Sequence, residues 1–438
     1  MKEKYVLVPG FFIFFLLFML AWIPSQAQED HSSAVRTLTL EECIAIALER
    51  NADAVISEKN VESAAAGVMG AVANFLPQLD ASSSYSKSAT EMSPDPNSYY
   101  SADLSLRQSL YRGGYNLANL SYVRAGHKKA QDSYEQTRQL VALEVKVRYF
   151  DLLQAARLLR VAEELVRSSE EQVKLEENLH EVGATTKANL LRAKVKLGED
   201  RLSFISAQNN LSIAKANLND ILSWSLDTAV EVVDNLDVER AELNLPSLIE
   251  RAISQHTSVK IAEARVQQAK ASLGMAKSGR MPSLSASGSY SWGDSDLPKG
   301  VEDWKAHDSW RFGLSLNMPI FDGFATKSNI RQARLNLAMA QEEWEQAVRD
   351  VALVVKQAYL NVTEAEERIQ VTEESLALAE EERRLAQERY RLGASLLLEL
   401  IDSQAAYSTA QTNHISALYD YQLAIAQLEN AVGSSLSP

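Results

Sequence analysis

The sequence predicts a mainly α-helical fold with a small β part, built by duplication of one unit: helix, strand, strand, very long helix and return helix. The first observation is an internal repeat, in which the stretch starting at Leu38 aligns with the stretch starting at Leu243, 205 positions later. The second is apolar residues at helical spacing over long runs, recurring every seven residues from Val371 to Leu392. The third is a pair of short segments in each copy in which apolar and polar residues alternate, as in β-strands.

The N-terminal segment has the composition of a secretory signal peptide. Lys2 and Lys4 form a short basic head, an apolar run extends from Phe11 to Ile23, and small residues precede the expected cleavage before Gln28. No later apolar stretch reaches the roughly 18 residues of a transmembrane helix, so any membrane crossing must use β-strands. The expected organisation is a signal peptide at 1–27, a first repeat at 28–222, a bridging segment at 223–244 and a second repeat at 245–438.

The two copies contain the same elements in the same order. In the first copy we expect helices at 39–75, 114–181 and 185–221, with strands at 78–88 and 102–111. In the second copy we expect helices at 245–280, 324–391 and 395–432, with strands at 283–293 and 309–320. A helix of about 68 residues spans about 100 Å, which no ordinary globular core requires. Because the helices 185–221 and 245–280 together match that length, we expect them to stack end to end, with a short strand in the bridge between them.

Each long helix must reverse direction at its far end. Gly183 and Gly393 lie at the two reversals, where glycine readily adopts the left-handed conformation that ends helices. Thr185 and Ser395 follow them and are the expected N-caps of the return helices. Two helical hairpins of similar geometry should result.

The strand expected at 309–320 has one apolar and one polar face. Its apolar residues are Trp310, Phe312, Leu314, Leu316 and Met318, which alternate with Arg311, Gly313, Ser315 and Asn317. A tilted strand of about 9–11 residues, apolar outside and polar inside, is typical of a membrane barrel around water. Four strands do not close such a barrel, so three copies would supply a twelve-stranded barrel above a ring of twelve helical columns. The alternative is a pair of surface hairpins on a soluble helical protein.

Composition and motifs argue against several classes of function. A net charge of −14 disfavours nucleic acid as a partner, because phosphates attract basic surfaces. The single cysteine, Cys43, excludes an intrachain disulfide and is expected to be a small buried residue. The six histidines are scattered, and no HExxH, GxSxG or phosphate-loop motif occurs. We therefore expect no enzyme, no cofactor and no metal site.

Several duplicated motifs occur in a fixed order: the entries to the strands "FLPQLDASSSYS" and "RMPSLSASGSYS", the exits "LYRGG" and "IFDGF", and the tip "ERYRLGASLLLELIDSQAAY". Together they resemble the TolC-type outer membrane factors, also called outer membrane efflux proteins, over residues 38–435. The resemblance implies a homotrimeric channel-tunnel in the outer membrane that extends into the periplasm, its 12-stranded β-barrel continuous with a 12-helix α-barrel.

The resemblance also implies partners. An inner-membrane transporter and a periplasmic adaptor, also called a membrane fusion protein, would deliver substrates such as drugs, metal ions or other small molecules. The channel itself would contact the lipid of the outer membrane and conduct these substrates passively. Two alternatives are an outer-membrane component of type I protein secretion and a periplasmic coiled-coil scaffold without a pore.

A gate at the periplasmic tip is a further implication of the resemblance. Matched position by position, an acidic ring falls on Glu399 and Asp402, which lie on one helix face. The polar links that hold such gates use an acid, a tyrosine and an arginine, whose positions are occupied here by Asn189, Tyr390 and Ser395. Only the tyrosine is kept, so an ionic lock is not expected.

The tips are also the expected contact with the adaptor, through segments 182–190 and 392–400. The turn residues in these segments are Gly183, Thr185, Gly393, Leu392 and Leu396. With two charged partners missing, we expect the closed gate to depend on packing around Leu392, Leu396 and Leu400 and on hydrogen bonds from Tyr390.

Overall fold

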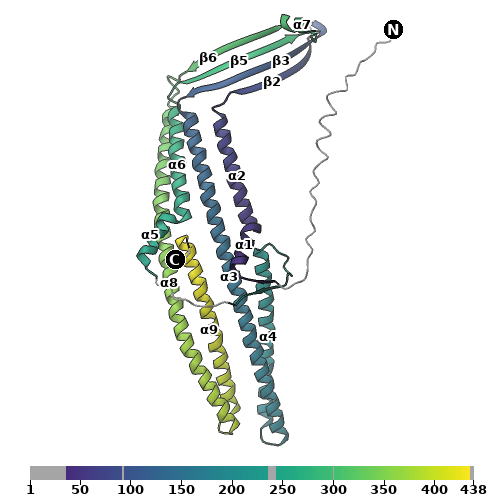
Figure 1. Cartoon of the computed structure of the whole chain (residues 1–438), viewed down its shortest axis with the longest axis vertical. Helices are drawn as coiled ribbons and strands as arrows, with labels where there is room; N and C mark the ends of the chain where they lie inside the picture. The colour runs from purple at the N-terminus through teal and green to yellow at the C-terminus, as the bar shows by residue number, and fades with distance from the viewer. Residues whose placement is uncertain (1–35, 91–92, 235–242, 299, 435–438) are drawn as a thin grey trace, which may run out of the picture.

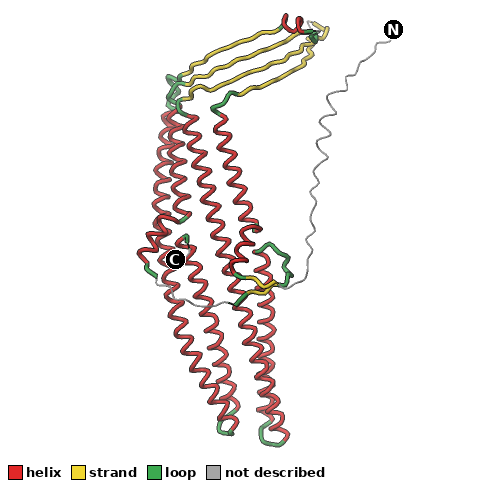
Figure 2. The backbone as a smooth tube through the Cα atoms, in the orientation of Figure 1, coloured by secondary structure: helices red, strands yellow, loops and turns green. Residues whose placement is uncertain are grey.

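The computed structural model describes residues 36–90, 93–234, 243–298 and 300–434. The molecule is elongated, with helical columns below a four-stranded sheet at one end (Figure 1). Two further short strands, β1 (Arg36–Leu38) and β4 (Val230–Val232), pair with each other about half-way along the columns (Figure 2). The signal peptide predicted at 1–27 lies outside the described residues.

The long helices and the return helices have the predicted bounds to within two residues. The helices are α1 (Leu40–Arg50), α2 (Ala52–Ala73), α3 (Tyr115–Glu181), α4 (Lys187–Ile221), α5 (Leu245–Gln255), α6 (Thr257–Ser278), α7 (Val301–Ala306), α8 (Ala325–Arg391) and α9 (Leu397–Val432). Both α3 and α8 have 67 residues, and together with their return helices they form two long hairpins. Within the described ranges, none of these helices has an apolar stretch long enough to cross a membrane.

Two helices that the sequence predicts as continuous are each broken once. Asn51 separates α1 from α2, and His256 separates α5 from α6, both in extended backbone conformation. Each side chain caps the helix that follows: Asn51 accepts from the backbone N–H of Asp53, and His256 Nδ1 from that of Ser258. Burial, helped by Lys260, lowers the pKa of His256 and so keeps this nitrogen free to accept. A capping side chain on an extended residue ends one helix and starts the next.

The main sheet has the strand order β2, β3, β5, β6, antiparallel throughout. Its strands are β2 (Gln78–Thr90), β3 (Ser93–Arg112), β5 (Ser283–Asp294) and β6 (Asp308–Asn317). β3 begins nine residues before the predicted start, in a tight hairpin with β2. β6 ends at Asn317, ahead of Pro319, which has no N–H for a ladder bond. Met318, predicted on the apolar side of this strand, therefore lies outside it. The single chain leaves the outer edges of β2 and β6 unpaired among the described residues.

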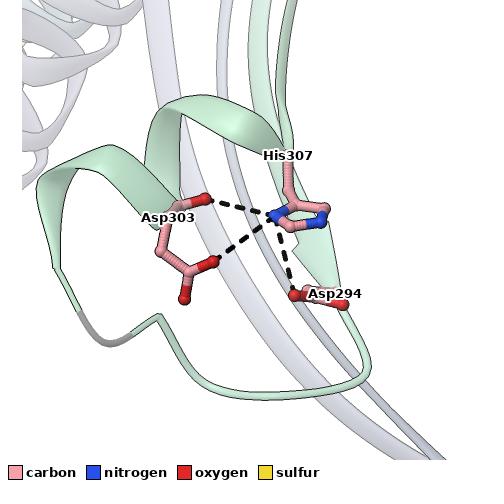
Figure 3. Close-up of side chains that lie close together, drawn as sticks. All are labelled: Asp294, Asp303 and His307. Atoms are coloured by element: carbon pink, nitrogen blue, oxygen red, sulfur yellow. Dashed lines mark hydrogen bonds and ion pairs between the residues drawn. The ribbon is translucent and has the colours of Figure 1, made fainter.

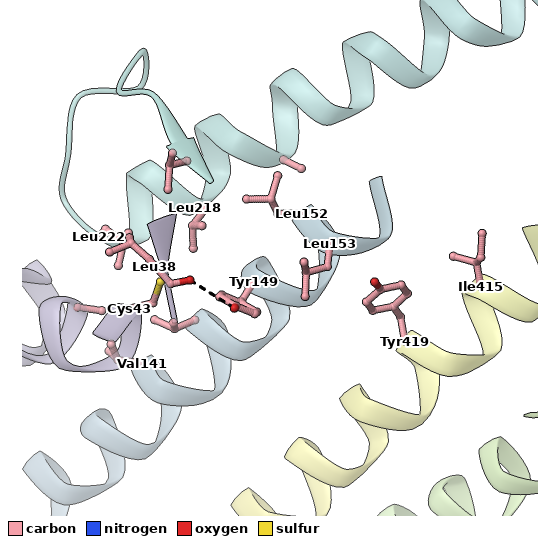
Figure 4. Close-up of a cluster of buried hydrophobic side chains, with 14 of the residues drawn as sticks. Leu38, Cys43, Val141, Tyr149, Leu152, Leu153, Leu218, Leu222, Ile415 and Tyr419 are labelled. Carbon is pink, nitrogen blue, oxygen red and sulfur yellow. Dashed lines mark hydrogen bonds between the residues drawn. The ribbon is translucent and has the colours of Figure 1, made fainter. Parts of the chain in front are cut away.

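The predicted stacking of the helix 185–221 on the helix 245–280 is wrong. The helix α4 packs on α3, as α1 and α2 do, so the column of α4 continues into the short helices of its own repeat (Figure 1). In the same way, α5 and α6 continue the column of α9, which lies between α3 and α8. A shared core fixes this arrangement: Leu218 of α4 and Leu222 just after it belong to the same buried cluster as Cys43 of α1 and Tyr149 of α3 (Figure 4).

The start of the bridging segment, up to Asp234, is held at the same level of the molecule. The β1–β4 pair confirms the short strand predicted in the bridge. Tyr149 donates its hydroxyl hydrogen to the carbonyl of Val233 at 2.7 Å, and the guanidinium of Arg157 binds both carboxylate oxygens of Asp234 at 2.9 and 2.8 Å. Two such paired bonds from arginine fix orientation as well as distance. The start of the bridge is therefore anchored on α3.

Candidate functional site

The main sheet has one apolar and one hydroxyl-rich face. Residues paired across neighbouring antiparallel strands lie on the same face, so the register assigns every side chain. The apolar face carries Leu79, Ala81, Leu104, Leu106, Ala286, Tyr290, Trp310, Phe312, Leu314 and Leu316. The hydroxyl face carries Ser82, Ser84, Ser101, Ser105, Ser285, Ser287, Ser289, Ser291, Ser309 and Ser315. The predicted residues from Trp310 to Leu316 thus share one face, and each is more than 60% exposed in the single chain.

The connection between β5 and β6 folds back onto the apolar face at the far end of the sheet. Trp304 of α7 stacks on Trp292 with ring centroids 4.9 Å apart, and Trp292 is buried. Trp304 Nε1 donates to the hydroxyl of Tyr290, which donates to Asp308. The sequence does not predict α7. Because Trp304 of α7 covers Trp292, that residue is buried, while Trp310 stays exposed.

Asp294, Asp303 and His307 form a cluster beside α7 that has the residue types of a metal site (Figure 3). His307 Nδ1 lies 3.1 Å from the backbone carbonyl of Asp303 and 3.6 and 3.8 Å from the two carboxylates. A carbonyl oxygen only accepts, so Nδ1 carries the hydrogen and is not a metal ligand. We interpret the cluster as a hydrogen-bonded closure of the loop.

The two hairpin tips have the same backbone geometry. Gly183 and Gly393 have φ of +75° and +69°, which confirms the predicted left-handed turns. In both tips the glycine and the following alanine return hydrogen bonds to the last turn of the long helix, from Gly183 to His180 and from Ala184 to Leu179 in the first tip. These hydrogen bonds hold the turn in one conformation, which fixes the direction in which each return helix begins.

The predicted N-caps are wrong by one position. Thr186, not Thr185, caps α4, accepting from the backbone N–H of Asn189 at 3.2 Å. In the second tip the N-cap position is Leu396, which has no capping side chain, and Ser395 Oγ has no hydrogen-bond partner among the described residues. The turn contains one residue more than the sequence suggests, so the N-cap of each return helix lies one residue later in the chain than predicted.

Thr185 is instead part of a buried network centred on Glu176 of α3. The Glu176 side chain is fully buried and accepts from Gln172 Nε2 at 3.0 Å, Thr185 Oγ1 at 3.0 Å and the hydroxyl of Tyr390. Asn189 Nδ2 in turn donates to Thr185 Oγ1 at 3.2 Å. Burial first, then Glu176, raises the pKa of Tyr390, so this hydroxyl keeps its hydrogen and donates. The network joins the tip of the second hairpin to the first.

Sequence reasoning missed Glu176, although a signal is present. Ser169, Val173 and Glu176 are buried at spacings of four and three, the pattern of a helix seam. An acid at a seam position is rarely buried without partners. An acid at a seam position of α3 is therefore the sequence feature that indicates a buried carboxylate with hydrogen-bond partners.

The other predicted gate residues form no hydrogen bond or ion pair with one another within the described part of the chain. Asn189 donates to Thr185 in its own hairpin and is not bonded to Ser395, whose Oγ is left unpaired within the described part of the chain. Glu399 forms a half-exposed ion pair with Arg389 at 2.8 Å, while Asp402 is exposed. In the single chain Leu400 is buried together with Leu397, while Leu392 and Leu396 are exposed, so their predicted packing at the gate stays a prediction for the assembled channel.

The sequence model of the family described as "Outer membrane efflux protein" matches residues 43–223 and 248–434, which cover both repeats. The chain belongs to this family. Outer membrane protein TolC of Vibrio cholerae is 23% identical over 406 residues, which make up 92% of this chain and 92% of that protein. Nodulation protein T of Rhizobium leguminosarum bv. trifolii is 24% identical over 400 residues, covering 89% of this chain and 84% of that protein.

Solved structures agree on the fold of this efflux protein. The Campylobacter jejuni CmeC outer membrane channel superposes with a TM-score of 0.80 and 20% identity, covering 91% of this chain and 87% of that chain. The open state of the Neisseria gonorrhoeae MtrE outer membrane channel gives 0.79 and 21%, covering 91% and 89%. The family resemblance predicted from the duplicated motifs is confirmed, and the efflux protein is located in the outer membrane.

Proposed function

We propose that three copies of this efflux protein close one passive channel across the outer membrane and the periplasm. The observation that carries the proposal is the two-faced sheet, with free edges at β2 and β6, on top of two hairpins about 100 Å long. In a closed ring the apolar face contacts lipid and the serine-rich face lines water. Three chains of four strands and four columns give a twelve-stranded barrel above twelve helical columns.

The free edges are suited to ring closure. β2 and β6 lie at opposite ends of an antiparallel sheet of four strands, so β6 of one copy can pair antiparallel with β2 of the next. Below the sheet, the edge helices α4 and α8 carry exposed apolar rows. On α8 the row is Val371, Leu378 and Leu385, continued by Leu392 just after the helix; on α4 it is Leu191, Val195, Leu202, Ile205 and Ile213. Exposed apolar rows of this length on a soluble segment favour burial against another helix.

The hydroxyl face supports conduction rather than retention of cargo. Its charged residues are few and of both signs, such as Asp103 and Arg311, so the wall has no single-sign site that would hold a solute. We propose small polar solutes as cargo, driven by an inner-membrane transporter. Secretion of a protein is the alternative, and loss of a secreted protein without loss of small-molecule efflux in a deletion strain would favour it.

The tips are the proposed contact with a periplasmic adaptor. Val182, Leu392 and Leu396 are 77%, 83% and 74% exposed, next to Gly183 and Gly393. Apolar side chains beside glycine offer a contact surface that a partner helix can approach closely.

A matched pair of lysine substitutions in β6 tests the channel. Leu314 lies on the apolar face nearer the middle of β6, and Ser315 lies beside it on the hydroxyl face. Leu314→Lys should deplete membrane-inserted protein, because lysine facing mid-bilayer lipid costs about 2–4 kcal/mol, whereas Ser315→Lys should insert normally. Purified Ser315→Lys and parent protein should both conduct in planar bilayers. Equal insertion of the two variants, or no conductance from inserted parent, would contradict the proposal.

A further inference from the structure

A groove of about 480 Å³ lies where β6 ends and α8 begins, at the junction of the sheet with the helical columns (Figure 1). One side of the groove is apolar and is formed by the exposed side chains of Ile320, Phe321 and Phe324. Arg280, which follows α6, and Lys327 of α8 line the same groove, and within the described ranges neither forms an ion pair. The groove therefore combines exposed apolar rings with two cations.

The first repeat joins the two sides of the equivalent junction by side-chain hydrogen bonds. Gln108 Nε2 donates to the carbonyl of Phe75 at 3.0 Å. Asn116 Nδ2 donates to the carbonyl of Asn74 at 3.1 Å. Both bonds run from β3 or α3 to the residues that follow α2, so they hold the two sides of that junction together.

The second repeat lacks both of these donors. At the repeat offset of 210 residues, their positions are occupied by Met318 and Thr326. Methionine has no side-chain hydrogen to donate, and Thr326 bonds to Asp322, whose carboxylate accepts its backbone N–H at 2.8 Å. This acid of the groove thus binds the start of α8. On the other side, Arg280 occupies the position of Phe75, so the second junction is open and cationic where the first is bridged.

Phe324 has a backbone conformation that is rare for a bulky residue. Its φ is +67°, and its position corresponds to Gly114 of the first repeat, whose φ is +82°. Glycine adopts this region freely, whereas a bulky side chain is strained there. The Phe324 ring lies edge-on to Phe321 with centroids 5.6 Å apart, and Lys327 Nζ is 5.7 Å from its centroid. A strained residue with an exposed ring indicates a role beyond the packing of the single chain.

The apolar side of the groove continues the apolar face of the sheet. By the repeat, Phe321 corresponds to Tyr111, which pairs with Leu284 in the row of Leu316. Tyr111 is 48% exposed although β3 has a strand on each side. We therefore expect a strand that pairs with β6 in a ring to leave much of the Phe321 ring uncovered, within reach of the lipid around the sheet.

We propose that this groove binds one anionic phospholipid of the periplasmic leaflet per chain. The phosphate contacts Arg280 and Lys327, and an acyl chain lies against Ile320, Phe321 and Phe324. A zwitterionic headgroup is disfavoured because its ammonium is repelled by the same two cations. A free phosphate ion would leave the rings without a partner, so a lipid accounts for both halves of the groove. The inference rests on the proposed channel, since a lipid-facing sheet brings this junction to the headgroups.

The test measures lipid binding to membrane-extracted, delipidated protein by native mass spectrometry. Phosphatidylglycerol is the anionic probe and phosphatidylethanolamine the zwitterionic one. The groove variants are the double variant Arg280→Gln with Lys327→Gln, and Phe324→Gly, which places the residue of the first repeat there and relieves the strain. Arg112→Gln is the matched control, because it removes a cation from the first junction, where the guanidinium lies over the Tyr115 ring.

The parent should bind phosphatidylglycerol more tightly than phosphatidylethanolamine, with one tight site per chain. Each basic residue near an anionic headgroup contributes about fivefold in affinity, so the double glutamine variant should bind phosphatidylglycerol about 25-fold more weakly and lose the preference. Phe324→Gly should weaken the binding of both lipids, because it removes a ring from the acyl-chain side. Arg112→Gln should match the parent.

No preference in the parent, parent-like binding by either groove variant, or an equal loss in Arg112→Gln would overturn the inference. Conductance in planar bilayers separates this result from the channel proposal. A parent protein that conducts but shows no preference for phosphatidylglycerol contradicts the lipid site alone. A parent protein that inserts without conducting contradicts the channel, while the binding data still decide what the groove holds.

Discussion

Cys43 lies in the core where α1, α3 and α4 meet, with no exposed surface. Burial first, then Glu42 and Glu41, raises the pKa of its thiol to about 12. The nucleophile is the thiolate, which a raised pKa depletes at every pH below that value. This residue behaves as the sequence predicts, as a small buried side chain.

We expect Cys43 to resist alkylation by a maleimide at pH 8 in the folded protein and to react completely after denaturation. Labelling followed by mass measurement checks this. Rapid labelling of the folded protein would mean that the core around α1 opens readily, in conflict with its complete burial.

The two acids of the predicted ring are not equivalent. Glu399 is compensated by Arg389, whereas Asp402 is exposed without an ion pair among the described residues. If multivalent cations block the channel from the periplasmic side, Asp402→Ala should relieve the block more than Glu399→Ala, because it removes an uncompensated charge. Bilayer recordings with a trivalent cation on that side measure this, and the reverse order would move the site of block away from Asp402.

At the scale of single residues, the sequence predicts a role that depends on local backbone conformation, but it does not predict a role that depends on contacts with residues far away in the chain. Gly183 and Gly393 are predictable because a helix reversal requires positive φ, which glycine adopts freely. Glu176 is not, since its role depends on Tyr390, 214 positions away. Matching by position assigns Asn189 and Ser395 to the gate, but Asn189 bonds within its own hairpin and Ser395 Oγ has no partner in the described ranges.

The elements of this efflux protein depend on how each helix begins and ends. The capping box of Thr39 and Glu42 starts α1, and the extended residues Asn51 and His256 restart a helix within one residue. A break of this kind changes the direction of the axis without a loop. The column can therefore follow α3, with which it shares the core.

Gly393→Ala should destabilise the second tip by about 1–2 kcal/mol, because alanine is strained at φ of +69°. Gly198 in α4 is the matched control: it has helical backbone and, in the single chain, open space where the alanine methyl group would lie, so Gly198→Ala should leave the second tip unchanged. Hydrogen exchange at the amides of the second tip compares the two variants. Equal exchange in the two variants would contradict the account of the turn.

Element bounds are predictable where periodicity, proline and glycine act locally. The helix α7 is not predictable in this way, since its position depends on Trp304 stacking on Trp292 across the loop. The strand β6 is overestimated at its end because alternation continues through Met318, whereas pairing stops before Pro319.

The whole molecule combines a sheet that suits lipid on one face and water on the other with two hairpins that pack against each other through α3 and α9. The sequence predicted the duplication and the four strands of each chain. It failed on the stacking of the columns, because equal helix lengths fit two arrangements and only the cores around Leu218 and Leu428 distinguish them. In the proposed trimer, the free edges of the sheet and the apolar rows on α4 and α8 would be covered by neighbouring copies in a closed ring.

Cross-linking between the two edge helices tests this ring most directly. In a Cys43→Ala background, Ile205→Cys on α4 and Val371→Cys on α8 place thiols on the two exposed apolar rows, each 22 residues from the glycine of its tip and so at the same height. Within a chain three helix spacings of about 8–10 Å separate the two rows, so a bis-maleimide shorter than about 15 Å reaches only a neighbouring copy. Membrane-extracted protein should give covalent dimers and trimers and nothing larger, with neither single variant doing so. Monomers alone, or a ladder that continues beyond three, would contradict the closed trimer.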